Sequence, residues 1–282
     1  MKYLRLDSQI LTSISHCPLR AKYTFIERLK SKEDHTPFQM GTGVHTAAES
    51  YYKDLKLSVP FKERIEKALL LSNTWMATES SLSQEEITTV LRTMNDYFTY
   101  RKEDPIYVQE VEVFFSKVLF VGKDLFDDDI TILYEGKIDL IADESDRITR
   151  VYDHKSTNRN FTPVDMRVQF LGYCWATGHS VVENRIGFQS SLKPEAKFVR
   201  FPYKYRPELI AEWQDFAIRK ALEYGYYLQT EKFPPNFGAC EGKFGYPCNY
   251  IDLCRFPELI DETKEYQFKI GEPWDPLKEK NT

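Results

Sequence analysis

Three consecutive strand-like segments in the middle of the chain constrain its fold most strongly. Residues 106–120 alternate and are rich in Val and Phe, and residues 127–143 and 147–156 continue in the same style. Two turn-forming stretches, GKDLFDDD and ESD, separate them. Such alternation, with many β-branched and aromatic residues, is typical of strands, so we expect three consecutive strands.

Helical patterns precede and follow these strands. Residues 43–56, 60–78 and 83–101 show helical spacing of apolar side chains, and two short helices, capped by Asp7 or Ser8, meet at Cys17-Pro18. After the strands we expect a helix over 163–177, strands over 182–192 and 197–203, and a long amphipathic helix over 207–229. This order predicts an α/β protein with a helical N-terminal lobe and a Cys-bearing C-terminal segment.

The composition limits the class of protein. Of the 282 residues, 42% are hydrophobic and 29% are charged, which is typical of a globular chain. The sequence has no run of about 18 to 20 apolar residues and no apolar signal core at its N-terminus, so we expect an intracellular protein with no membrane partner. A net charge of −5 argues against a general basic coat but leaves a local basic groove open.

Charged side chains interrupt two of the expected strands. Asp139 lies in GKIDLIAD, and Asp153 and Lys155 lie in VYDHK. Burying an unpaired carboxylate is costly, and residues two apart on a strand project to the same side. If the hairpin brings Asp139 beside the other two, the carboxylates form a site for Mg²⁺ or Mn²⁺ next to a positive charge, an arrangement suited to phosphodiester hydrolysis. The alternative is an ordinary ion pair between Asp153 and Lys155 at a sheet edge.

Four short motifs follow one another along the chain. They are GTGVH at residues 41–45, GKID at 136–139, DHK at 153–155 and QFLGY at 169–173. The series resembles the PD-(D/E)XK nuclease superfamily, and within it the RecB-like branch, whose pattern runs G-x-x-x-H, G-x-I-D, D-x-K and Q-x-x-x-Y. The resemblance implies a restriction-endonuclease-like core, in which a central mixed β-sheet is flanked by helices.

The same resemblance implies the roles of individual residues. The implied metal ligands are His45, Asp139, Asp153 and the backbone carbonyl of His154. The implied catalytic residues are Asp139, Asp153, Lys155, Gln169 and Tyr173. Three further carboxylates could support the ligands, namely Glu49, Glu110 and Glu112. We expect a helical lobe at 1–104, a nuclease core at 105–232 and a C-terminal segment at 233–282 that packs back on the N-terminus.

Three of the five cysteines, Cys240, Cys248 and Cys254, are close together near the C-terminus. Thiolates at this density bind zinc or an iron-sulfur cluster. The segment around Cys17 resembles the N-terminal element of RecB-like nucleases of the AddB-like or CRISPR-associated type, which implies that Cys17 and these three hold a four-iron four-sulfur cluster. The gap between Cys240 and Cys248 is longer than the C-x-x-C of relatives, which leaves zinc, or a non-ligating Cys240, as alternatives. We expect Cys174 to be a buried free thiol.

The function implied by the resemblance is that of a Mg²⁺- or Mn²⁺-dependent DNA exonuclease. Its substrate would be single-stranded DNA or DNA ends, in recombination, repair, phage replication or CRISPR adaptation in the cytoplasm of a bacterial or virus-infected host cell. Protein partners in these processes, and association of the chain with itself, are left open. The alternatives are a structure-specific endonuclease with the same site and a non-catalytic, zinc-stapled DNA-binding protein. The candidate phosphate contacts, most of which we expect to be ordinary surface charges, are Arg20, Lys22, Arg159, Arg167, Lys193, Lys197, Arg200, Lys204 and Arg206.

Overall fold

The computed structural model describes residues 2–32, 36–157, 166–241, 247–273 and 275. The chain forms two compact units, each assembled from separate stretches of sequence. The first comprises Met1–Asp34, Ser116–Gly136 and Glu208–Lys278, and the second comprises mainly His35–Phe115 and Lys137–Pro207. Strands β3 (Tyr107–Lys123) and β4 (Asp129–Asp143) contribute residues to both units.

The first unit begins with β1 (Lys2–Leu6), which pairs in parallel with the first half of β4. Asp7 ends this strand and caps α1 (Ser8–His16), since its carboxylate accepts the N–H groups of Gln9 and Ile10 at 2.8 Å. Pro18 opens α2 (Pro18–Ala21), and a π-helical turn (Lys22–Ile26) continues it. The expected pair of short helices at Cys17-Pro18 is therefore confirmed.

Later parts of the chain complete the first unit. The elements are α8 (Pro207–Thr230), a 3₁₀ turn (Phe237–Ala239), α9 (Ile251–Arg255), a 3₁₀ turn (Pro257–Leu259), α10 (Ile260–Gln267) and β8 (Phe268–Ile270). Strand β8 pairs antiparallel with β2 (Leu29–Ser31). A small apolar cluster that includes Tyr23, Tyr250 and Phe268 joins sequence from the two ends of the chain.

The second unit contains the mixed part of the sheet. Strand β5 (Thr149–Thr157) pairs antiparallel with β4, β6 (Ser180–Gly187) pairs in parallel with β5, and β7 (Phe198–Tyr203) pairs antiparallel with β6. A parallel pair needs a crossover, and α6 (Val168–Thr177) lies in the connection from β5 to β6. The expected start of this helix at 163 lies outside the described residues. Helix α7 (Pro194–Lys197) precedes β7.

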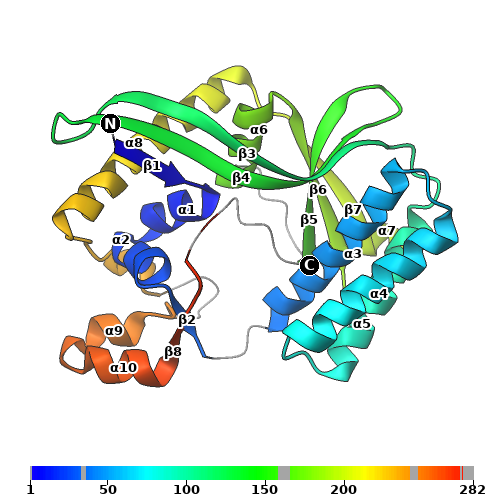
Figure 1. The fold of residues 1–282 in the computed structure, drawn as a ribbon, viewed down its shortest axis with the longest axis horizontal. Helices are drawn as coiled ribbons and strands as arrows, with labels where there is room; N and C mark the ends of the chain where they lie inside the picture. Colours follow the sequence, from blue (N-terminus) through cyan, green and yellow to red (C-terminus); the bar gives the residue numbers. More distant parts are fainter. Residues whose placement is uncertain (1, 33–35, 158–165, 242–246, 274, 276–282) are drawn as a thin grey trace. The chain divides into compact units, whose positions relative to one another are not determined.

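Three helices, α3 (Thr36–Lys56), α4 (Phe61–Glu79) and α5 (Gln84–Tyr100), pack together in the second unit (Figure 1). Their buried side chains form one core with those of β4 to β7, and within it Tyr51 stacks on Phe98 at 4.1 Å. The expected mixed sheet flanked by helices is confirmed. No helix in the described ranges combines the length and the apolar character needed to cross a bilayer.

Candidate metal centre

The register of β4 and β5 sets the position of the two central aspartates. Pairing runs from Asp143–Thr149 to Leu140–Tyr152, so it ends one residue short of Asp139 and Asp153. The next backbone donor, the N–H of His154, bonds to Asp139 Oδ2 at 2.7 Å. The Asp139 side chain is therefore held against β5 where the regular ladder ends.

Asp139 and two other potential ligands lie close together. His45 on α3 places Nδ1 3.5 Å from Asp139 Oδ1. Ligand atoms of His45, Glu112 and Asp139 all lie within 4.8 Å of one another. Gly41, one turn before His45, lies close to β5, because a Cβ there would sit 3.3 Å from Ser156 Oγ. The small residue lets α3 approach the strand. Carboxylate oxygens and an imidazole nitrogen fit Mn²⁺, and Mg²⁺ when water completes its shell.

Glu112 reaches this group through an unusual backbone conformation. It lies within β3 but has a φ of 57°, in the left-handed region. Such a conformation costs about 1–3 kcal/mol in a non-glycine residue and clusters at functional sites. Glu112 also forms an ion pair with Lys137. The sequence suggested only a supporting role for Glu112, because the E-x-E pattern at 110–112 does not show which carboxylate turns inward.

Asp153 and Lys155 form a close pair on β5. Lys155 Nζ lies 2.8 Å from each Asp153 carboxylate oxygen. Asp153 is 1% exposed, whereas the Lys155 side chain is 34% exposed. Asp153 is outside the group that His45, Glu112 and Asp139 form. The expected ion pair and the expected metal group are thus adjacent features of one site.

Opposing charges set the pKa values of these groups. Burial alone would lower the pKa of His45, but the Asp139 carboxylate outweighs burial and raises it above the usual 6.5. Burial opposes ionisation of Asp139 too, yet His45 holds its pKa far below the ordinary range. Burial raises the pKa of Asp153, and burial together with the charge of Asp139 raises that of Glu112. A divalent cation would relieve this repulsion between carboxylates.

Gln169 and Tyr173 face the same side of α6, as their spacing predicts. Gln169 Nε2 donates to Tyr173 Oη at 2.8 Å, and Tyr173 Oη donates to the backbone carbonyl of Lys137 at 2.7 Å. Tyr173 is 4% exposed. The pair therefore ties α6 to β4, two residues before Asp139.

A buried polar network lies behind His154. Asn184 Nδ2 lies 2.6 Å from Tyr97 Oη and 2.9 Å from His154 Nδ1, and Tyr97 Oη lies 2.7 Å from Tyr52 Oη. Asn184 Oδ1 and His154 Nε2, at the edges of this network, are buried and have no hydrogen-bond partner among the described residues. Burial lowers the pKa of His154 to about 4, which keeps the ring neutral. The network fixes the segment of β5 whose backbone meets Asp139.

Four cysteines line one cavity of about 20 Å³ in the first unit, namely Cys17, Cys240, Cys248 and Cys254. The N–H of Asn236 donates to Cys17 Sγ at 3.3 Å. Burial and the other three thiols raise the pKa of Cys254 to about 11. Thus the structure brings together the four thiols that the sequence grouped. Cys174 lies elsewhere, buried on α6.

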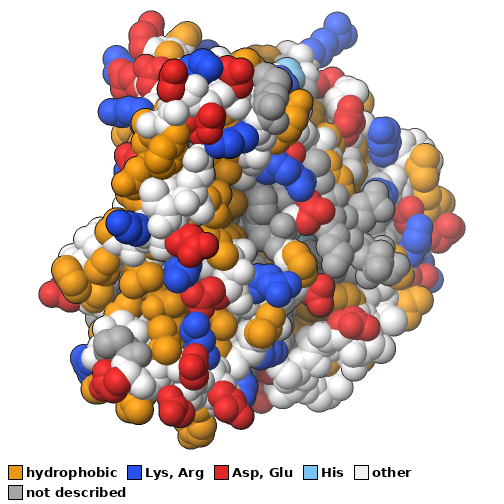
Figure 2. Space-filling view, turned by 60° about the vertical axis from the view of Figure 1, so that its left-hand side comes forward, with side chains coloured by type: hydrophobic (Ala, Val, Ile, Leu, Met, Phe, Trp, Pro, Cys, Tyr) orange, Lys and Arg blue, Asp and Glu red, His pale blue; other side chains and the backbone are white. Residues whose placement is uncertain are grey.

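Several candidate phosphate contacts are already paired within the protein. The pairs are Lys197 with Asp96, Arg200 with Asp104 and Arg167 with Glu183. The three basic side chains are only 6% to 19% exposed and each is neutralised by a carboxylate, so these three are structural. Lys193 and Lys204 are exposed, and Arg159 lies outside the described residues. On the face in Figure 2, acidic and basic side chains of the described residues are interspersed.

Comparisons with known proteins bear on the family and on the fold. A family model described as the PD-(D/E)XK nuclease superfamily matches residues 9–255. The crystal structure of a candidate exonuclease from Eubacterium rectale superimposes with a TM-score of 0.51 at 11% identity, covering 89% of this chain and 87% of that one. The crystal structure of SSO0001 has a TM-score of 0.30 at 11% identity, covering 64% of this chain and 84% of that one, which is too low to bear on the fold. No curated protein matches.

The family match spans all four motifs, from Gly41 to Tyr173, and the segments that carry the four clustered cysteines. The structural likeness supports the same fold at low sequence identity. The chain belongs to the PD-(D/E)XK nuclease superfamily.

Proposed function

We propose that this chain is a divalent-metal-dependent DNA exonuclease of the RecB-like type, acting on single-stranded DNA or DNA ends. One observation carries the proposal. Ligand atoms of His45, Glu112 and Asp139 lie within 4.8 Å of one another, and Lys155, held by Asp153, lies within electrostatic reach of Asp139. Cation ligands beside a fixed ammonium group suit the hydrolysis of a phosphodiester.

His45, Glu112 and Asp139 would hold Mg²⁺ or Mn²⁺, and Asp153 would join them when Lys155 turns to the substrate. In a strand, the N–H and C=O of one residue project to the same edge. Because the His154 N–H bonds to Asp139, the His154 carbonyl lies on the same edge of β5 and would be a further ligand. When bound, such an ion lowers the pKa of a water molecule and neutralises charge on the phosphate.

Lys155 would donate to the phosphate oxygens as charge develops on them. Burial alone would lower its pKa, but Asp153 and Asp139 outweigh burial and raise it, so the ammonium stays protonated at neutral pH. Its partly exposed side chain can reach a substrate. Gln169 and Tyr173 would act as positioning residues, because they hold β4 through the Lys137 carbonyl.

The four clustered cysteines would hold a four-iron four-sulfur cluster that joins distant segments of the first unit. Metal binding stabilises the fold directly when its ligands come from separate parts of a chain. Zinc is the second candidate, because the cavity of about 20 Å³ has room for a single ion as it stands. Absorbance near 400 nm and equal contents of iron and sulfide would support the cluster; one zinc per chain without iron would support the alternative.

The biological setting that fits this chemistry is DNA processing in the cytoplasm, during recombination, repair, phage replication or CRISPR adaptation. DNA would be the substrate, and other proteins of these processes, or a second copy of the chain, would be partners. The family membership supports DNA as the substrate.

The test is digestion of linear and circular DNA, single-stranded and duplex, with Mn²⁺ or Mg²⁺. An exonuclease degrades linear single strands and leaves circles intact, and EDTA stops it. Cleavage of circles, or of one position in a branched substrate, would favour the endonuclease. Binding of DNA without any cleavage by freshly purified, metal-loaded protein would favour the non-catalytic alternative.

A further inference from the structure

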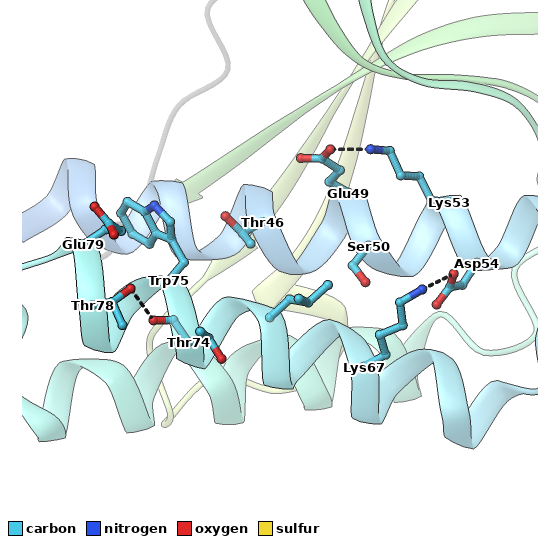
Figure 3. A pocket seen from close by; sticks show the side chains of 11 residues that line it. Thr46, Glu49, Ser50, Lys53, Asp54, Lys67, Thr74, Trp75, Thr78 and Glu79 are labelled. Atoms are coloured by element: carbon cyan, nitrogen blue, oxygen red, sulfur yellow. Dashed lines mark hydrogen bonds and ion pairs between the residues drawn. The ribbon is translucent and has the colours of Figure 1, made fainter. Parts of the chain in front are cut away.

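A groove of about 280 Å³ runs between α3 and α4 in the second unit, and the metal centre does not use it (Figure 3). Trp75 and Leu71, both on α4, supply an apolar wall. Leu71 is 44% exposed, so it presents apolar surface to the groove. The volume suits one planar ring system of the size of a nucleobase with part of its sugar.

The groove also contains buried polar groups that have no partner. Ser50 is 7% exposed and Asp54 is 3% exposed, and both residues line the groove. Within the described part of the chain, Ser50 Oγ and Asp54 Oδ2 have no hydrogen-bond partner, whereas Asp54 Oδ1 accepts from Lys67 Nζ at 2.8 Å. Buried oxygens without partners destabilise the protein, so a ligand that bonds to them gains affinity.

The groove begins next to the metal centre on the same helix. Thr46, adjacent to His45, lines it, and so does Glu49, one turn further along α3. His45 and Glu49 are four residues apart, so they lie on the same face of α3. A strand bound at the metal centre can therefore place a neighbouring nucleotide in the groove.

The charges around the groove favour an uncharged ligand. Glu49 pairs with Lys53 at 2.6 Å, and Asp54 pairs with Lys67 at 2.8 Å. Glu79 adds a negative charge beside Trp75. A phosphate inside the groove would meet these carboxylates, whereas Lys53 and Lys67, whose side chains are 55% and 58% exposed, could contact phosphates outside it.

We propose that the groove takes one unpaired nucleobase of the substrate strand, with its face on Trp75 and its edge toward Ser50 and Asp54. Every base presents a hydrogen-bond donor next to an acceptor on its Watson–Crick edge. Asp54 would accept from the donor at Oδ2 while Oδ1 keeps its bond to Lys67, and Ser50 would donate to the acceptor. That edge is free only in a single strand, so the groove selects single-stranded DNA without selecting sequence. This inference rests on the proposed nuclease function.

The experiment measures binding of the full-length protein to labelled oligonucleotides, with Ca²⁺ in place of Mn²⁺ to prevent cleavage. The variants are Trp75→Leu, which removes the flat ring, and Ser50→Ala, which removes the hydroxyl. The matched control is Leu70→Ala, since Leu70 is a 63% exposed neighbour on α4 that does not line the groove. Circular dichroism of each variant checks that it is folded.

Trp75→Leu is expected to weaken single-strand binding by about 5- to 100-fold and to leave duplex binding unchanged. An abasic position scanned along the strand should weaken wild-type binding at one register, and the same abasic strand should bind Trp75→Leu no worse than the intact strand does. Binding that stays within about twofold of wild type for Trp75→Leu and for every abasic strand overturns the inference. So does equal weakening of duplex and single-strand binding.

A parallel digestion with Mn²⁺ separates this inference from the proposed function. If wild-type protein degrades no DNA, the nuclease proposal fails. If wild-type and Trp75→Leu proteins degrade single strands with the same KM and kcat, only the groove inference fails. A higher KM with little change in kcat supports a base-binding role.

Discussion

The buried network behind His154 makes a quantitative prediction for Tyr97→Phe. Tyr97 is 0% exposed, and its hydroxyl lies 2.7 Å from Tyr52 Oη and 2.6 Å from Asn184 Nδ2. Removing the hydroxyl leaves Tyr52 Oη and one of the two amide hydrogens of Asn184 buried without this partner, at a cost of about 1–3 kcal/mol each. Allowing for partial relaxation, we expect the free energy of unfolding to fall by about 2–4 kcal/mol.

The assay is urea unfolding followed by circular dichroism, together with thermal unfolding. For a chain of this size, each kcal/mol corresponds to roughly 2–4 °C in Tm. Tyr100→Phe is the control, because Tyr100 lies on the same helix but is 42% exposed. A loss below about 0.5 kcal/mol for Tyr97→Phe, or an equal loss for Tyr100→Phe, would refute the reasoning that the Tyr97 hydroxyl stabilises the fold through its two buried hydrogen bonds.

Three further predictions concern the metal sites. The neighbouring aspartate raises the pKa of His45 against the effect of burial, so protons compete with the metal and Mn²⁺ affinity should fall as the pH drops through that raised pKa; calorimetry would show it, and a flat profile would contradict it. The stability of the metal-free protein should depend on pH in the opposite direction. Protonated His45 contributes its full stabilisation below pH 6.5, and this stabilisation is lost as the pH rises through the raised pKa. Glu112→Gln should weaken Mn²⁺ binding at least about 10-fold, whereas the exposed Glu110→Gln should not; equal affinities would remove Glu112 from the site. Cys17→Ser should lower the metal content of the first unit and its Tm, while Cys174→Ser keeps the metal; retention of full metal content by Cys17→Ser would contradict the shared site.

Elements with a strong local pattern could be predicted from the sequence. The central strands were recognisable because their alternation reflects burial on a sheet, whatever their partners are. Strand β1 was not predicted, because its five residues are extended only through pairing with β4, more than a hundred residues away. Helix α3 begins at Thr36 rather than at the expected 43, since Pro37 is tolerated in a first turn.

The site could be predicted in part for a similar reason. Asp139 and Asp153 stood out as charges within apolar runs, and their register on paired strands followed from the hairpin. Glu112 did not stand out, because a positive φ inside a strand leaves no mark on the sequence. Nor could the sequence show that Arg200 is compensated by Asp104, which lies almost a hundred residues away.

The most direct test compares metal binding with DNA cleavage in wild type, Asp139→Asn and Lys155→Ala. Mn²⁺ binding is measured by calorimetry, and cleavage is measured on a labelled linear single strand. We expect Asp139→Asn to lose metal and cleavage together, because Asp139 is central to the ligand group. We expect Lys155→Ala to keep Mn²⁺ affinity within about 10-fold but to lose at least about 100-fold in rate, since Lys155 acts on the phosphate. Cleavage at the wild-type rate by Asp139→Asn would show that this carboxylate does not hold the catalytic metal.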